Sequence, residues 1–447
     1  MSKNTSLHQL PTELGNNLVL RFATRKDTDE LVDFNTRIHE ESAAGFAVRD
    51  LMTGKHPTTQ AADFTVVEDT NAREIVSSMC LISQSWSYGG IPFKLGRPEF
   101  VATDPDYRKR GLVRKQFEVI HAVSAQKGEL MQGITGIPWF YRQFGYEMAL
   151  DLEANRILDD VNIPSRTRGR AESCRLRARS PVDNAFIQEL YQIAIERQVF
   201  ACPRSALMWE YELEGRSEGS GARFEWEIIE DLAGTRLGYV TYLPMLWQIS
   251  DNPCFWVTQL ELKPGIGYLY LMQSLLRSLW AKAKKSSVAD NGKSKNAKGI
   301  AFTLGRDHQA YTAMPNYVLR NEDSYAWHIR IPDTIAFLRH IHPALEKHLV
   351  GTVAEAYTGE LRLNFYQGGL RMKFEAGHLS EISRWCPGSF EDGDVQLPGM
   401  TFWQVLCGRF RTNELTSQFA DCSATSDAAV LLDCLFPPFT GDVWALE

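Results

Sequence analysis

The sequence predicts a mixed α/β fold in which helices flank more than one sheet. From Leu18 to about residue 150, short apolar runs typical of strands alternate with segments whose apolar residues recur at helical spacing. A second succession of the same kind follows in the next part of the chain. The length of 447 residues favours two to four domains, and an apolar content of 44% is ordinary for a globular protein.

Residues 18–88 predict a strand, a helix and a hairpin. The strand run "LVLRFAT" begins at Leu18, and Leu31, Phe34 and Ile38 then fall on one face of a helix. The runs "FTVVED" and "EIVSSMCLISQSW" are rich in β-forming residues and enclose the polar turn "TNAR". Together they predict a hairpin.

The following residues predict a strand, a basic turn and a second helix. The run "FVAT" leads into "DYRKRGLVR", and Val113, Phe117 and Ile120 form one face of the helix after it. "GELMQGITGIP" predicts a further strand and a bend, and "FYRQFGYEMAL" predicts a helical turn that enters a last strand. The predicted order for residues 18–150 is β-α-β-β-β-α-β-α-β, a sheet of mixed direction.

The second part of the chain repeats this order after a connector at residues 151–172. It contains the strand "CRLRARS", a helix from Asp183 to Arg197, the strands "RFEWEIIED" and "RLGYVTYLP", and a strand and helix in "FWVTQLELKPGIGYLYLMQSLLRSLWAKAKK". This succession predicts an internal duplication. The insert "KKSSVADNGKSKNAKG" has low hydrophobicity and predicts a surface loop.

The third part predicts a helix and a hairpin. Pro332 and Asp333 precede the amphipathic segment "TIAFLRHIHPALEKHL", as start residues of a helix do. In "LRLNFYQGGLRMKF", apolar and polar residues alternate on both sides of Gly368 and Gly369. Paired glycines tolerate the positive φ that a tight hairpin turn requires.

Composition and charge exclude several classes of function. A net charge of −7 and a pI near 5.9 argue against general binding to nucleic acid or to anionic membranes. No apolar run is long enough to span a bilayer, and the N-terminal residues lack a signal-type apolar core. The eight cysteines are scattered without a C-x-x-C pair, so we expect reduced thiols in a cytoplasmic protein.

The basic turn is the strongest candidate for a binding site. Arg108, Lys109 and Arg110 precede Gly111, between a predicted strand and a predicted helix. The N–H groups and the dipole of a first helical turn favour phosphate, basic side chains add charge-assisted hydrogen bonds, and glycine allows close approach. A solvated basic helix start is the alternative interpretation of the same residues.

Two motifs about thirty residues apart, "RKRGLV" and "FYRQFGYE", carry a resemblance. The first resembles the R/Q-x-x-G-x-G/A pyrophosphate loop of the GNAT superfamily of acetyl-CoA-dependent N-acetyltransferases, with Val113 in place of the usual small residue. The second resembles a later motif of that family, and "LVLRFATRKDTDELVDFN" resembles its opening strand and helix. The whole chain resembles the enhanced intracellular survival (Eis) type, which joins a catalytic GNAT domain, a degenerate GNAT domain and a C-terminal sterol-carrier-protein-like domain.

The resemblance implies tandem GNAT-like sheets followed by a sterol-carrier-like α+β domain. The expected domains are residues 1–155, catalytic; 156–326, degenerate; and 327–447, sterol-carrier-like. Where the second domain matches the basic turn it reads "LELKPGIGYLYL", with Lys263 as the charged residue. We therefore expect the second domain to have a structural role.

The resemblance also implies acetyl-CoA as the cosubstrate, with no metal. The central strand would align the pantetheine arm and polarise the thioester carbonyl, and the basic turn would hold the pyrophosphate. The expected cofactor-binding residues are Val101, Thr103, Arg108, Lys109, Arg110, Gly111, Leu112 and Val113.

Tyr141, in "FYRQFGYE", lies at the family's general-acid position, from which a phenol could protonate the departing CoA thiolate. A packed core tyrosine is the alternative. In Eis-type enzymes the chain-terminal carboxylate serves as the base, which implies Glu447 here, with Trp444 as a substitute for the family's terminal aromatic residue. Glu40 and Glu41 are candidates for binding the substrate ammonium; a solvated helix end is their alternative.

The expected function is transfer of acetyl from acetyl-CoA to a primary amine by direct attack in a ternary complex. We expect a cytoplasmic homo-oligomer that acts on a small-molecule or lysine-like amine and binds neither nucleic acid nor membrane. The alternative is a non-catalytic protein that binds a ligand in its third domain and uses the GNAT fold as a scaffold. His340, His342 and His348 do not converge on one helix face, so we expect no metal site there.

Overall fold

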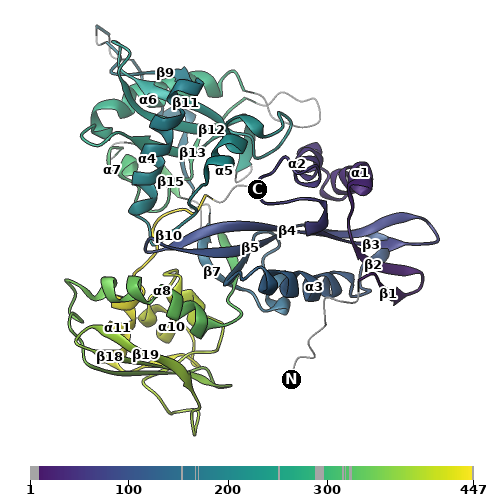
Figure 1. Cartoon of the computed structure of the whole chain (residues 1–447). Coiled ribbons are helices and arrows are strands. Elements are labelled where there is room, and N and C mark those ends of the chain that lie inside the picture. The colour runs from purple at the N-terminus through teal and green to yellow at the C-terminus, as the bar shows by residue number, and fades with distance from the viewer. Residues whose placement is uncertain are drawn as a thin grey trace.

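The computed structural model describes residues 10–152, 155–166, 168–169, 171–249, 252–286, 296–314, 317, 319–321 and 325–444. They form three units, each with its own sheet and helices packed against it, which confirms the predicted mixed α/β fold. Figure 1 shows the first sheet in the middle of the molecule, with the second unit above it and the third unit below it. Within these residues, no helix is long and apolar enough to cross a membrane.

The first sheet is mixed, and the long hairpin of β4 (Glu74–Tyr88) and β5 (Ile91–Thr103) lies at its centre. Among the described residues its strand order is β1-β2-β3-β4-β5-β6-β16-β7, and β10 pairs with the end of β4. The other strands are β1 (Thr12–Gly15), β2 (Leu18–Phe22), β3 (Phe64–Asp69), β6 (Met131–Ile134), β7 (Glu147–Leu152), β10 (Phe200–Ala201) and β16 (Tyr325–Arg330).

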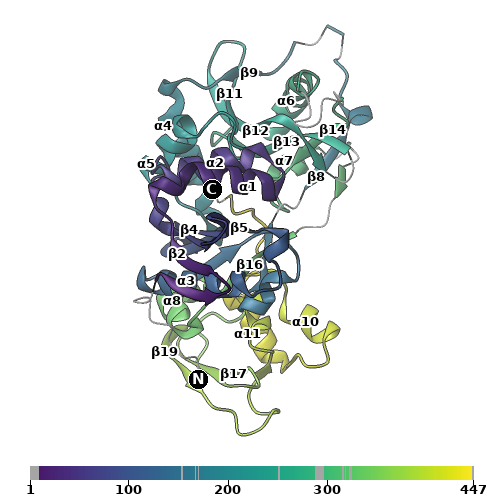
Figure 2. The same ribbon diagram turned by 90° about the vertical axis from the view of Figure 1, so that its right-hand side faces the viewer.

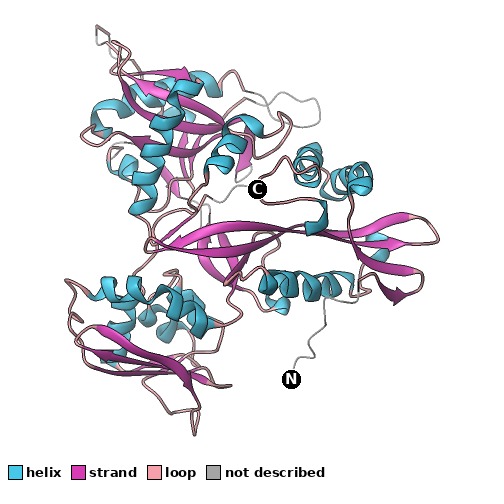
Figure 3. Ribbon diagram, viewed as in Figure 1, coloured by secondary structure: helices cyan, strands magenta, loops and turns pink. Residues whose placement is uncertain are grey.

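Helices cover both faces of this sheet (Figure 3). α1 (Thr28–His39) and α2 (Ser42–Met52) bury apolar residues such as Leu31 against β3, β4 and β5. α3 (Leu112–Gln126) packs on the opposite face, where Phe117 is fully buried. The structure confirms the predicted periodicities of α1 and α3, whereas α2 was not among the predicted elements.

The second sheet is also mixed, with the order β15-β8-β14-β13-β12-β11-β9 among the described residues. Its strands are β8 (Arg156–Asp159), β9 (Arg175–Ala178), β11 (Glu225–Glu230), β12 (Arg236–Ile249), β13 (Asn252–Leu262), β14 (Gly299–Phe302) and β15 (Leu319–Asn321). Its helices are α4 (Asn184–Glu196), α5 (Ala206–Glu210), α6 (Tyr268–Ala283) and α7 (Gln309–Thr312).

The two sheets exchange a strand with each other (Figure 2). β8 follows β7 in the chain, yet it lies in the second sheet between β14 and β15. β16 follows β15, yet it lies in the first sheet between β6 and β7. The first sheet runs β2-β3-β4-β5-β6-β16-β7, and the second runs β9-β11-β12-β13-β14-β8-β15. The two orders match at every position, with β16 and β8 at equivalent places. Each sheet is therefore completed by a strand that directly follows, along the chain, a strand of the other sheet.

This exchange bears on the predicted domain boundaries. The boundary at 155–156 falls between β7 and β8, and the boundary at 326–327 falls inside β16. Both boundaries remain predictions. The pairing of β16 with β6 and β7 joins residues that are 173 to 198 positions apart, and such pairing leaves no local signal in the sequence.

The third unit is a smaller sheet covered by helices on one face (Figure 1). The predicted hairpin is present: Asn364 pairs with Gly369, and Gly368 has a φ of 143°. The strands are β17 (Gly359–Asn364), β18 (Gly369–Glu375), β19 (His378–Trp385), β20 (Val395–Gln396) and β21 (Ser423–Ala424). The helices are α8 (Thr334–Leu349), α9 (Thr401–Leu406), α10 (Thr412–Gln418) and α11 (Ser426–Leu435).

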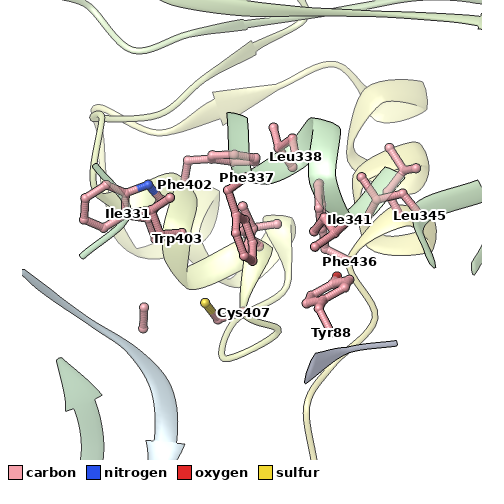
Figure 4. Packing of buried hydrophobic residues seen from close by; sticks show 14 of the residues in the cluster. Tyr88, Ile331, Phe337, Leu338, Ile341, Leu345, Phe402, Trp403, Cys407 and Phe436 are labelled. Carbon is pink, nitrogen blue, oxygen red and sulfur yellow. The ribbon is translucent and has the colours of Figure 1, made fainter. Parts of the chain in front are cut away.

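The core of the third unit continues into the end of the first sheet. Figure 4 shows Tyr88 of β4 beside Phe337 and Ile341 of α8 and beside Phe436. The ring of Tyr88 meets Phe337 edge-on at 6.4 Å and Phe200 of β10 at 5.0 Å between centroids. The third unit is therefore packed against the first sheet and not merely joined to it by a linker.

The last described residues run from the third unit back to the second. The N–H of Phe439 donates to the Gly408 carbonyl at 2.8 Å. Five residues later, Trp444 lies against Phe224 and Trp256 of the second unit. Its carbonyl accepts a hydrogen bond from Arg204 at 3.0 Å. This segment thus connects the third unit with the second.

Candidate active site

The basic turn lies between β5 and α3. β5 ends at Thr103, a 3₁₀ turn follows, and α3 begins at Leu112. Lys109 (φ 63°) and Gly111 (φ 75°) both have left-handed backbone. That conformation is uncommon for lysine but costs glycine little, which explains why glycine precedes the helix.

The backbone N–H groups of the turn are available to a ligand. Among the described residues, no acceptor within the protein faces the N–H groups of residues 109–114, and Gly111 carries no side-chain cap. Successive N–H groups in a turn with left-handed residues form a concave anion site, and the α3 dipole adds partial positive charge. The turn thus has the geometry of a phosphate site.

Hydrogen bonds hold the side chains around this turn in place. The Arg110 guanidinium donates to the Asp106 carbonyl at 2.9 Å and lies 4.6 Å above the Tyr107 ring. The Tyr107 hydroxyl donates in turn to Asp69 at 2.7 Å. Arg108, Lys109 and Arg110 are all exposed, so their charge faces solvent at the edge of the turn.

β5 and β6 separate next to the turn. They pair only at Leu95 with Met131 and at Gly96 with Gln132, although β5 continues to Thr103. Among the described residues, the end of β5 from Phe100 to Thr103 therefore lacks a strand partner on the β6 side. We call this opening the splay. Unpaired backbone at the splay can accept and donate hydrogen bonds to an extended ligand.

A β-bulge distorts β5 inside the splay. Ser78 of β4 pairs with Ala102 and Cys80 pairs with Glu99, so β5 has one extra residue there. Phe100 has a φ of 52°, which is a genuine outlier for an aromatic residue. Bulges near functional sites redirect side chains and backbone, and this one precedes Val101 and Thr103.

Tyr141 lies at the splay, in the 3₁₀ turn Phe140–Phe144. It packs in one cluster with Val101 of β5 and Ile134 of β6. A Cβ atom at Gly136 would lie 3.2 Å from the Tyr141 hydroxyl, so a side chain there would crowd it. Within the described part of the chain this hydroxyl has no hydrogen-bond partner, although the Tyr141 residue is 94% buried (6% exposed).

Burial, followed by the charge of Glu99 and by Tyr325, raises the pKa of Tyr141 well above its ordinary value. The phenol therefore stays protonated at neutral pH. A protonated hydroxyl without a protein acceptor, beside an open strand edge, can donate a proton or a hydrogen bond to a ligand in the splay.

Glu99 was not among the predicted site residues. Its carboxylate accepts from Arg97 Nε at 2.7 Å, and the Arg97 guanidinium lies 4.9 Å above the Trp327 ring. The Glu99 side chain is 13% exposed and its charge acts on Tyr141. A glutamate in a strand carries no functional signal by itself, and only the bulge and the pairing of β16 bring it to the splay.

The structure places the predicted substrate residues at the edge of this region. Glu40 ends α1 with a φ of 58°, Glu41 precedes α2, and both are exposed. The neighbouring His39 ring meets Phe100 of the bulge at 6.2 Å, so this junction lies beside the splay. Trp444 packs against the second unit, as described above, and Glu447 lies outside the described residues.

The second unit differs at the corresponding place. β13 and β14 pair as far as Val257 and Phe302 and then separate. A cavity of about 50 Å³ remains there, and the C-terminal residues Asp442 and Trp444 form part of its lining. A second cavity of about 220 Å³ borders it and shares the lining residues Ala194, Gln198, Glu261, Leu304 and His308. Lys263 is the charged residue of the turn that follows.

The comparisons with known proteins agree with this geometry. Residues 20–149 match the family model described as an acetyltransferase (GNAT) domain. We call these residues the acetyltransferase domain after the family model that they match. No curated protein matches the sequence. The basic turn, the splay and Tyr141 all lie inside this acetyltransferase domain.

Solved structures resemble the chain over nearly its whole length. A GCN5-related N-acetyltransferase from Anabaena variabilis has a TM-score of 0.66 at 14% identity, covering 95% of this chain and 99% of that one. A GCN5-related N-acetyltransferase from Kribbella flavida has a TM-score of 0.61 at 18% identity, covering 96% and 98%. Eis1 from Mycobacterium abscessus has a TM-score of 0.59 at 14% identity, covering 96% and 100%. At these identities the likeness shows a common fold.

The histidines of α8 make bonds to backbone. His340 contacts the Pro92 carbonyl at 2.7 Å and His348 contacts the Leu435 carbonyl at 2.9 Å. In the described part of the chain, no group of three or more His, Cys, Asp or Glu residues is arranged to hold a metal ion.

Proposed function

We propose that the chain is an acetyl-CoA-dependent N-acetyltransferase that acylates a primary amine by direct attack in a ternary complex. The observation that carries this proposal is the conjunction of an unpaired N–H turn, an open splay and a protonated Tyr141 in one acetyltransferase domain. Each part matches one region of an acyl-thioester cosubstrate: pyrophosphate, pantetheine arm and leaving sulfur.

Acetyl-CoA would lie with its pyrophosphate at the basic turn. The N–H groups of Gly111, Leu112 and Val113 would donate to phosphate oxygens, and Arg108, Lys109 and Arg110 would add charge. Val113 is no obstacle, because its backbone and not its side chain faces the anion. The pantetheine arm would pair with the open edge of β5 at Val101 and Thr103, as an added strand does.

The acceptor amine must lose a proton before it attacks. A lysine-like ammonium has a pKa of about 10.4, so deprotonation at pH 7 opposes the reaction by roughly 4 kcal/mol. The charge of the Glu99 carboxylate contributes to the raised pKa of Tyr141. We propose that Glu99 accepts the proton of the amine, directly or through water. Glu447 as the base stays a prediction.

Tyr141 would complete the transfer. When the amine nitrogen bonds to the acetyl carbon, the carbon–sulfur bond breaks and the thiolate needs a proton. Tyr141 carries its proton at neutral pH, as a phenol does, and its hydroxyl has no other acceptor among the described residues, so it can pass that proton to the sulfur. Glu40 and Glu41 at the α1–α2 junction would attract the ammonium form of the acceptor from solvent.

We also propose that the second unit is structural, that the third unit is sterol-carrier-like, and that the enzyme is a cytoplasmic homo-oligomer. The likeness to Eis1 over nearly the whole of both chains supports a common arrangement of the three units. The third unit packs onto the end of the first sheet through Tyr88, so it supports the acetyltransferase domain whether or not it holds an apolar ligand.

The proposal is tested by free-thiol release from acetyl-CoA with a panel of primary amines and the full chain. Time-dependent release that requires both amine and protein is the expected result. Release equal to the hydrolysis background with every amine, despite bound acetyl-CoA, would favour the non-catalytic alternative.

A further inference from the structure

A buried arginine lies where the acetyltransferase domain meets the second unit. Arg216 follows the π-helix Tyr211–Gly215 and is 2% exposed. Among the described residues, none of its three guanidinium nitrogens has a hydrogen-bond acceptor. Its contact with the Tyr211 ring, at 4.7 Å, satisfies the face of the guanidinium but none of its N–H groups. A buried cation in this state is costly, and an acceptor supplied by a ligand would satisfy it.

The nearby carboxylate, Asp50 of α2, is already engaged. It accepts from Ser217 N at 2.8 Å and from Ser217 Oγ at 2.6 Å, and it pairs with Lys55 at 3.3 Å. Asp50 fastens the loop after Arg216 to α2. It does not hydrogen-bond to Arg216 itself.

A second unpaired donor lies beside Arg216. His56 is 2% exposed, and its ring meets Tyr211 at 4.9 Å. Its Nδ1 accepts from the N–H of Thr58 at 3.3 Å, which assigns the proton to Nε2. Nε2 is buried and has no partner among the described residues. Burial, then the charge of Arg216, lowers the pKa of His56 to about 3, so this ring is neutral.

These donors are close to the splay. The charge of Arg97 also acts on His56, and Arg97 is bonded to Glu99. Glu99 in turn acts on Tyr141. The Thr58 hydroxyl, two residues from His56, donates to the Ser83 carbonyl of β4 at 2.6 Å, and Ser83 pairs with Gly96 of β5, where the splay begins.

From the unpaired guanidinium and the unpaired imidazole N–H, we propose that Arg216 and His56 bind a carboxylate of the acceptor, so that the enzyme acetylates an amino acid or a similar amino-carboxylate. This rests on the proposed function. The Arg216 guanidinium carries one positive charge and a planar pair of N–H donors. A carboxylate matches it with one negative charge and two acceptor oxygens. Polyamines and other purely cationic acceptors offer nothing to these donors.

The test compares amines that differ by one carboxylate. With full chain and acetyl-CoA, thiol release is measured for lysine against 1,5-diaminopentane, phenylalanine against 2-phenylethylamine, and leucine against 3-methylbutylamine. For each pair, kcat/KM of the amino acid is divided by kcat/KM of the amine that lacks the carboxylate. This ratio is measured for wild type and for Arg216→Met, so the difference in amine pKa between the two substrates affects both proteins equally and cancels. We expect Arg216→Met to reduce the ratio about 10- to 100-fold, through the KM of the carboxylated member.

Two further variants separate binding from structure. His56→Phe keeps the ring on Tyr211 but removes the Nε2 donor, and we expect a smaller loss of the ratio. Ser217→Ala weakens the loop contact with Asp50 and leaves both donors, so we expect a lower Tm with the ratio unchanged.

Arg216→Met without ligand should have a Tm no lower than wild type, because it removes an unpaired buried charge. A lower Tm for Arg216→Met with an unchanged ratio would assign Arg216 a structural role and overturn the proposal.

The same amines are also tested by Tm alone, which separates this proposal from the proposed function. We expect the amino acids to raise the Tm of wild type but not of Arg216→Met. If no amine is acetylated while this difference persists, the proposed function fails and the carboxylate site stands. If amines are acetylated without preference for the carboxylate, or if neither assay distinguishes wild type from Arg216→Met, the carboxylate site is refuted.

Discussion

Tyr141 and Tyr146 are five residues apart, share one aromatic cluster and have different surroundings. Tyr146 is fully buried and its hydroxyl lies 2.9 Å from His121 Nε2. Tyr141 has its hydroxyl beside Gly136 at the splay, with no protein partner in the described residues. The first arrangement satisfies a core tyrosine, whereas the second leaves a hydroxyl for a ligand. The two residues therefore form a matched pair for mutagenesis.

Tyr141→Phe should lower kcat by about 100-fold and leave the KM for acetyl-CoA nearly unchanged, because it removes a proton donor and no binding surface. Tyr146→Phe should retain kcat and lower the free energy of unfolding by about 1 kcal/mol, through the lost bond to His121. Steady-state kinetics and denaturant titration measure both effects. A Tyr141→Phe enzyme with wild-type kcat would remove this residue from the mechanism.

Three histidines make the stability of the chain depend on pH: His56 and His328 are buried, and His121 is half-buried. Burial is the main cause that lowers the pKa to about 3 for His56, about 3 for His121 and about 4 for His328. In the unfolded chain these rings would bind protons near pH 6.5. Below that pH the unfolded state therefore binds more protons than the folded state, and stability is lost as the pH falls.

We expect the free energy of unfolding to decrease between pH 6.5 and pH 5, by about 1.4 kcal/mol per pH unit for each ring that stays neutral in the fold. Denaturant unfolding at several pH values measures this slope. His121→Gln should flatten it, whereas His342→Gln, at an exposed position on α8, should not. A slope that is unaffected by His121→Gln would contradict the assignment.

At the scale of elements, the turn between β5 and α3 can be compared with the other end of α3. Gly111 and Gly128 both have left-handed backbone, with φ values of 75° and 70°, and a Cβ at either would meet no atom within 4 Å. Alanine at either position should therefore cost similar stability, about 1 kcal/mol. Only Gly111 borders the unpaired N–H groups.

We predict that Gly111→Ala weakens acetyl-CoA binding by about tenfold, because the N–H groups around residue 111 shift when the strained turn relaxes. Gly128→Ala should lose the same stability and bind acetyl-CoA normally. Equilibrium binding and thermal unfolding of both variants are the measurements. Equal affinities in the two variants would separate the turn from cofactor binding.

The sequence was informative about local elements and less so about their assembly. The periodicity of α3, the basic turn and the hairpin of the third unit follow from neighbouring residues, and the structure contains them. The bulge at Phe100, the position of Glu99 and the unpaired Arg216 depend on pairing between distant segments. For the same reason, the exchange of β8 and β16 could not be predicted from local patterns.

At the scale of the whole molecule, the exchanged strands make the first two units interdependent. β16 fills the position between β6 and β7, and β10 extends the sheet at β4. A chain that ended at residue 155 would leave the edges of β6 and β7 unpaired. It would also expose the apolar residues that Trp327 and Ile329 cover. Open edges of this kind promote aggregation.

We therefore expect a fragment of residues 10–155 to show no cooperative unfolding transition and no acetyl-CoA binding. Co-expression with residues 156–447 should restore both, because that fragment supplies β16 and β10. Circular dichroism melting and size-exclusion chromatography are the measurements. An isolated fragment that melts cooperatively and binds acetyl-CoA would show that the exchange is dispensable.

We expect acetyl-CoA to bind at one place, the basic turn of the acetyltransferase domain. Isothermal titration of the full chain with acetyl-CoA tests it most directly, since the second unit has the same strand order but a different turn. We predict one site per chain, with an affinity that falls as salt rises, because the pyrophosphate is held by charge. Two equivalent sites per chain, or no binding heat at any salt concentration, would contradict the account.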